Sequence, residues 1–135
     1  MELLSSESQV LAGILFLALV TVESGGLYLM RLVRGKDQVT PFQMSFARAG
    51  HAHAGVLLVL ALVCQPYVDA TGLDGVLGWL ARSGVAVAAL LMPGGFFFSS
   101  MGKGRTQPNG FIVMVFLGAA LLAVSLTSLG LGLLL

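Results

Sequence analysis

Four long apolar stretches, separated by short polar connections, form the pattern of this chain. Each stretch can cross a bilayer as a helix, because a hydrocarbon core of about 30 Å needs about 20 helical residues. The connections and their edges carry most of the charged residues. The pattern predicts an all-α membrane protein in which a single domain, residues 1–135, forms a bundle of four transmembrane helices near 9–33, 42–66, 77–100 and 110–134.

The helix boundaries differ in how sharply the sequence marks them. Thr40 suits the N-cap of the second helix, and Pro41 suits its first helical position. The third stretch is less regular, because residues 72–82 contain several glycines, Trp79 and Arg82. That segment also fits a short interfacial helix, in which case the membrane-spanning part would start near Ser83.

Composition supports the membrane assignment and excludes other classes. The chain is 57% hydrophobic and 10% charged, with a mean hydropathy of +0.97. That charge is too little to cover a soluble domain of this length. The formal net charge of +1 comes with no basic stripe, which excludes nucleic acid as a partner. The single cysteine, Cys64, excludes an internal disulfide and thiolate metal clusters.

The basic residues predict an orientation. Six of the seven lie on one side of the predicted bundle: Arg31, Arg34, Lys36, Arg48, Lys103 and Arg105. The N-terminus and the second connection carry acidic residues instead. The positive-inside rule therefore predicts that the basic side faces the cytoplasm of the inner or plasma membrane, with both termini on the other side.

The chain also contains a weak internal repeat. Gly25-Gly26, Gly35-Lys36 and Thr40-Pro41 are followed, 67 to 69 residues later, by Gly94-Gly95, Gly102-Lys103 and Gln107-Pro108. A duplication would make two helical hairpins related by a pseudo-twofold axis along the membrane normal. Chance is the alternative, because glycine and proline are common in membrane helices and loops.

Three titratable side chains stand inside the apolar stretches: Glu23, His51 and His53. Counted from the predicted helix ends at 1.5 Å per residue, Glu23 is roughly 15 Å deep and the histidines are roughly 14–17 Å deep. The first two helices are antiparallel neighbours, so Glu23 and a histidine can share a depth. A lone carboxylate in the membrane needs such a partner. We therefore expect a polar site in the cytoplasmic half.

The spacing of these residues limits the site. His51 and His53 point about 200° apart around one helix, so they do not clamp a metal by themselves. Arg48 shares the face of His51, one turn earlier. Other candidates near the same end are Ser99, Ser100 and Asn109 as supporting groups, and Pro93, Gly94, Gly95, Gly25 and Gly26 as hinges.

Each of these features has a structural alternative. The histidines can be packing groups that donate to carbonyl oxygens. Glu23 can be a protonated acid bonded to a neighbouring helix. Arg48 can be an anchor that extends to the interface, and the Pro93-Gly94-Gly95 break can be a packing kink.

The run Arg48-Ala-Gly-His51-Ala-His53-Ala-Gly55 resembles, locally, the His-x-His helix entry of proteins related to haem–copper oxidase subunit I. In that superfamily, histidines on membrane helices ligate haem iron or copper. The resemblance implies at most one axial haem ligand here, at His51 or His53, because the chain has no further histidine. The run also resembles one in small bacterial four-span membrane proteins of unknown function, which implies the fold and no activity.

Three functions fit these observations. The first is binding of a small ligand, a divalent metal or haem by His51, His53 and Glu23, with the cofactor unknown. The second is a dimeric proton-coupled transporter or channel. The third is a non-catalytic accessory subunit of a larger membrane complex. Catalysis is disfavoured because no nucleophile–base pair is apparent. The expected partners are the lipid bilayer and either a second copy of the chain or a larger membrane complex.

Overall fold

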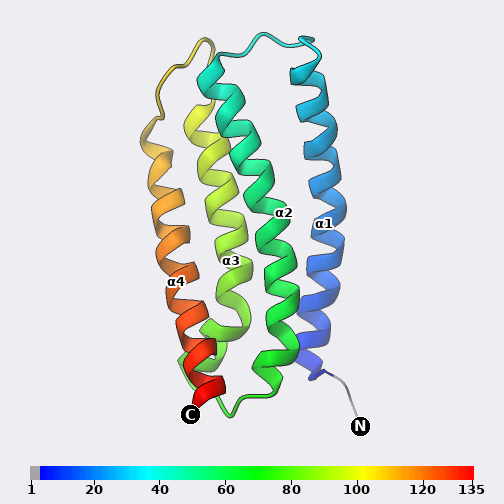
Figure 1. Ribbon diagram of the computed structural model, residues 1–135, viewed down its shortest axis with the longest axis vertical. Coiled ribbons are helices and arrows are strands. Elements are labelled where there is room, and N and C mark those ends of the chain that lie inside the picture. The colour runs from blue at the N-terminus through cyan, green and yellow to red at the C-terminus, as the bar shows by residue number, and fades with distance from the viewer. Residues whose placement is uncertain (1–3) are drawn as a thin grey trace.

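A computed structural model describes residues 4–135 and shows four long helices in a sequential row. They are α1 (Ser6–Val33), α2 (Pro41–Asp69), α3 (Gly75–Ser100) and α4 (Val113–Leu134), with a short 3-10 helix η1 (Gly110–Ile112) before α4. Neighbouring helices are antiparallel, and α1 and α4 stand at opposite edges of the row (Figure 1). The connections 34–40 and 101–109 lie at one end, here called the basic end. The connection 70–74 and the C-terminus lie at the other, the terminal end.

The prediction of an all-helical chain with four apolar helices is confirmed. All four are long and apolar enough to cross a membrane. The start of α2 is the one expected, since the Thr40 side chain accepts from Gln43 N and the Gln43 side chain accepts from Thr40 N in a capping box. A separate interfacial helix over residues 72–82, the alternative for the third stretch, does not form. Instead α3 is continuous from Gly75 to Ser100.

Glycines bring α3 and α4 close together. A β-carbon on Gly95 would lie 2.6 Å from Val115 Cγ2 and 2.7 Å from the Val115 backbone nitrogen. One on Gly118 would lie 2.5 Å from Met92 Cγ, and one on Gly84 would overlap the Ser125 hydroxyl. Such separations admit only glycine, so these positions fix how closely the two helices pack.

The row is not closed into a ring, and α1 is its least buried member. Within residues 4–135, α1 packs mainly on α2, touches α3 slightly, and makes no contact with α4. In the most apolar 18-residue window of each helix, 6% of the α1 residues are buried, against 39% for α3. One side of α1 therefore has no protein neighbour within the described chain.

Candidate functional site

His51 packs against the backbone of α1. A β-carbon on Gly25 would lie 3.2 Å from His51 Nδ1, and one on Gly26 would lie 3.5 Å from His51 Cε1. The Gly25-Gly26 pair therefore leaves room for an imidazole between α1 and α2. The ring is partly exposed rather than enclosed.

His53 faces the other way, towards α3. Its Nδ1 lies 2.7 Å from the Ala49 carbonyl oxygen of the preceding turn. Its ring centroid is 5.0 Å from that of Phe96. The two histidines thus contact different helices, as their spacing on one helix requires.

Glu23 and Arg48 are both exposed, on the outer side of the contact between α1 and α2. Glu23 lies three residues before Gly26, and Arg48 lies three residues before His51, so each is about 60° around its helix from a residue in that contact. Within residues 4–135, no hydrogen bond or ion pair joins Glu23 to a histidine.

These side chains do not form a metal centre on their own. Across residues 4–135, no three histidine, cysteine, aspartate or glutamate side chains converge. His51 and His53 point to different helices, and Glu23 is on the outer side of α1. A zinc ion would find too few ligands here, because zinc sites use three or four protein donors.

A cleft of about 570 Å³ opens at the basic end, between α1 and α3 with α2 as its floor. Gly25 and Ala47 line it, and Gly25 also contacts the His51 ring. The walls are mostly apolar, with hydroxyl groups from Ser24 and Tyr28. The full lining is Ser24, Gly25, Tyr28, Leu32, Val39, Gln43, Ala47, Phe97, Phe98, Ser100, Met101 and Gly102.

Of the three predicted supporting side chains, that of Asn109 fixes the 101–109 connection, whereas those of Ser99 and Ser100 bond within α3. Ser99 and Ser100 are buried and donate to carbonyls of their own helix. Asn109 caps η1 and donates to the Phe98 carbonyl. Gln43, which the sequence analysis did not single out, ties the two basic-end connections together by donating to the carbonyls of Ser100 and Gly102.

The predicted hinge residues lie inside continuous helices. Helix α3 passes through Pro93, Gly94 and Gly95 without interruption, and Gly95 is the point of closest approach to α4. In α1 the Gly25-Gly26 pair accommodates His51. In this structure, each glycine pair serves a contact with the following helix.

A polar cluster at the terminal end was not predicted from the sequence. The Asp69 carboxylate accepts hydrogen bonds from the backbone and hydroxyl of Ser5, from the Ser8 hydroxyl and from the Arg82 guanidinium. The side chains of Arg82 and Asp69 are 24% and 14% exposed. Gln65, fully buried nearby, donates to the Arg82 carbonyl, while its Oε1 has no partner within the described residues. The opposite charges of Asp69 and Arg82, on either side of the connection 70–74, could have indicated this cluster from the sequence.

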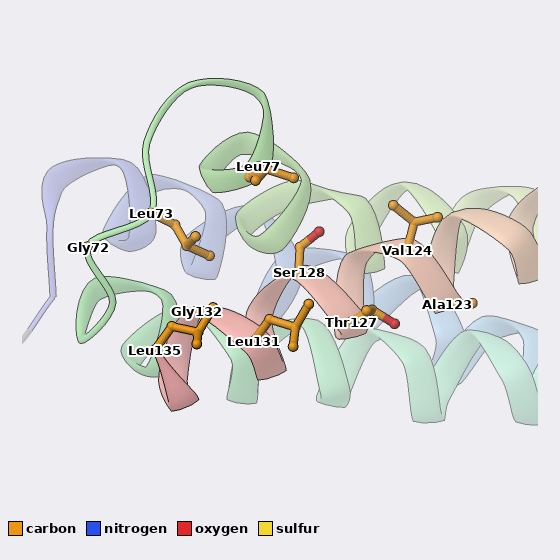
Figure 2. Close-up of a pocket in the computed structure, with 10 residues that line it drawn as sticks. All are labelled: Gly72, Leu73, Leu77, Ala123, Val124, Thr127, Ser128, Leu131, Gly132 and Leu135. Atoms are coloured by element: carbon orange, nitrogen blue, oxygen red, sulfur yellow. The ribbon is translucent and has the colours of Figure 1, made fainter.

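The terminal end also has an apolar groove of about 610 Å³. Figure 2 shows Gly72, Leu73 and Leu77 on one side and residues of α4 on the other. Leu73 packs onto α4 at Gly132, where a β-carbon would lie 2.5 Å from its Cδ1. The groove contains none of the predicted site residues, and its walls are nearly all apolar.

No family model, curated protein or solved structure matches this chain.

Proposed function

We propose that this chain is a multi-pass membrane protein that binds a small amphiphilic molecule in the basic-end cleft. In this proposal the basic end faces the cytoplasm and both termini lie on the opposite side. Six of the seven basic residues belong to that half of the chain, which is the distribution that the positive-inside rule describes.

The size and lining of the cleft support this function. Its volume of about 570 Å³ falls within the usual range for small-molecule sites, roughly 300–1,000 Å³. Such sites combine apolar walls with a few polar groups that orient the ligand. Here Leu32, Val39 and Phe97 supply apolar surface, while Ser24 and Tyr28 supply hydroxyls at one wall. The cleft lies between helices, so an amphiphile can enter it from the bilayer.

The contact between the cleft and His51 carries the proposal. Gly25 lines the cleft on one side and touches the His51 ring on the other. Ala47, four residues before His51, lines the floor. A ligand in the cleft is thus separated from a titratable imidazole by a residue without a side chain.

Haem binding has weaker support. His53 has its Nδ1 bonded to a backbone carbonyl, which leaves Nε2 as the only ring nitrogen that would be available to hold haem iron. Its ring lies against Phe96, away from the cleft residue Gly25. Bound haem would supply redox chemistry, and His53 would be the residue that holds it. An amphiphile in the cleft, by contrast, does not need His53 to turn away from Phe96.

Native mass spectrometry of the protein extracted gently from its own membrane tests the proposal. We expect one dominant bound species, whose mass distinguishes an amphiphile from haem or a metal ion. Ser24→Phe places an aromatic ring in the cleft and should lower the bound fraction roughly tenfold, as a steric cost of about 1–3 kcal/mol predicts.

The matched control is Thr21→Phe, which adds the same ring at an exposed position one turn earlier in α1, outside the cleft lining. It should leave the bound fraction unchanged. Loss of the bound species in both variants, or in neither, would contradict the cleft as the binding site.

A further inference from the structure

A second pocket, of about 280 Å³, lies where α1 ends at the basic end of the molecule. Two apolar residues and three cations line it: Leu27, Met30, Arg31, Arg34 and Lys36. We call these five residues the basic pocket. None of them lines the cleft, so the two sites are separate.

The turn that ends α1 brings the three cations together. Gly35 follows the helix with a φ of 69°, in the left-handed region that favours glycine. Its N–H donates to the Leu32 carbonyl, and the Lys36 N–H donates to the Arg31 carbonyl. These two bonds make a Schellman turn. The turn folds Lys36 back towards the end of α1, where Arg31 and Arg34 stand.

The basic pocket carries positive charge that the described chain does not neutralise. Asp37 accepts hydrogen bonds from Nε and Nη2 of Arg31. Within residues 4–135, neither Arg34 nor Lys36 forms an ion pair. Three cations and one anion therefore leave a net charge of +2. The nearest acid along α1 is Glu23, eleven residues before Arg34 and roughly 16 Å from it along the helix axis.

The length of α1 places the basic pocket among lipid head groups. The helix has 28 residues and is about 42 Å long, close to the roughly 40–45 Å of a bilayer with its head groups. The last turn, with Arg31 and Arg34, therefore lies at head-group level. Leu27 and Met30, which are 73% and 51% exposed, lie one to two turns deeper, at the level of the first part of the acyl chains.

We propose that the basic pocket binds one anionic phospholipid of the adjacent leaflet. Arg34 and Lys36 hold the phosphate, and the first part of an acyl chain lies along Leu27 and Met30. Charge complementarity selects this occupant, because phosphate forms strong hydrogen bonds with guanidinium and ammonium groups. Basic sites at the ends of membrane helices recognise anionic head groups in this way. The proposal goes beyond ligand binding in the cleft and does not depend on it.

Lipid titration of the full-length protein in detergent, followed by native mass spectrometry, tests the proposal. All variants carry Ser24→Phe, so that occupancy of the cleft does not contribute to the signal. Phosphatidylglycerol should bind at least about tenfold more tightly than phosphatidylcholine, whose head group has no net charge. Arg34→Gln should lower the affinity for phosphatidylglycerol roughly fivefold, the effect of one basic side chain at a membrane surface. Arg34→Lys keeps the charge and should retain most of the affinity.

Lys103→Gln is the matched control. It removes one positive charge from the same end of the molecule, but Lys103 lies in a hollow lined only by residues 102–107, without an apolar wall. This variant should bind phosphatidylglycerol as its parent does. Inorganic phosphate in large excess should not displace the lipid, because it has no acyl chain to place along Leu27 and Met30.

The proposal is overturned if the two lipids bind equally well, or if Arg34→Gln binds phosphatidylglycerol as tightly as its parent. An equal loss in Lys103→Gln would also overturn it, because the preference would then come from the overall charge of the basic end. Displacement by inorganic phosphate would do the same, by showing a site for free anions in which the lipid chain has no part.

Discussion

Polar side chains inside these apolar helices obtain partners in two ways. Some bond to a carbonyl one turn earlier in their own helix, as His53 does with Ala49 and Ser125 with Leu121. Others bond across helices, as Asp69 does with Arg82 and Ser8. The first kind fixes a rotamer without joining helices. The second kind connects three helices at the terminal end and should contribute more to stability.

The Asp69–Arg82 pair provides a test at the residue scale. Arg82→Ala leaves a largely buried carboxylate without its charge partner, although its bonds to Ser5 and Ser8 remain. We expect a loss of about 2–3 kcal/mol in the free energy of unfolding. Thermal unfolding in detergent micelles, followed by circular dichroism, measures it.

The control is Arg31→Ala, which removes the other described ion pair of the chain, with Asp37. The side chains of Arg31 and Asp37 are 60% and 37% exposed, so this ion pair should contribute little to stability. Equal losses in the two variants would show that the terminal-end cluster has no special role.

The sequence predicted how far along the helices the candidate residues lie better than it predicted which way their side chains face. Counting residues from Pro41 and Val33 placed His51 level with the middle of α1, and His51 does contact Gly25 and Gly26. The side on which Glu23 lies could not be counted in this way. Helix α1 is apolar almost all around, so its sequence does not show which side faces α2.

The helices themselves were predictable because their limits are chemical. Thr40 and Pro41 start α2, and a basic, glycine-containing segment follows α1. The beginning of α3 was ambiguous, because residues 72–82 suit either an interfacial helix or the first turns of a longer one. In the structure, α3 begins at Gly75, whose φ of 55° turns the chain directly into the longer helix.

The α3–α4 contact provides a test at the element scale. Gly95→Ala would place a methyl group 2.7 Å from the backbone nitrogen of Val115, which cannot move without shifting α4. We expect a loss of about 1–3 kcal/mol in unfolding free energy. Unfolding in mixed micelles of increasing denaturing detergent measures this loss.

Gly130→Ala in α4 is the matched control, because nothing lies within 4 Å of its added β-carbon. It should be neutral or stabilising by up to about 1 kcal/mol, through better helix propensity. A neutral Gly95→Ala would mean that the two helices pack less closely than the structure indicates.

For the whole molecule, the decisive property is that the row of helices is open. The cleft between α1 and α3 exists because α1 packs on α2 and barely touches α3. The same openness leaves Glu23 without a neighbour on the outer side of α1. Ligand entry from the bilayer requires that the four helices cross the membrane.

Cysteine labelling from each side of the membrane tests that requirement most directly. Gln107, at the basic end, and Asp74, at the terminal end, are exposed, and Cys64 is buried. In intact cells, an impermeant maleimide should label Asp74→Cys and leave Gln107→Cys unlabelled. In inside-out vesicles the result should reverse. Labelling of both positions from the same side would contradict the four-crossing arrangement, and with it ligand entry into the cleft from the bilayer.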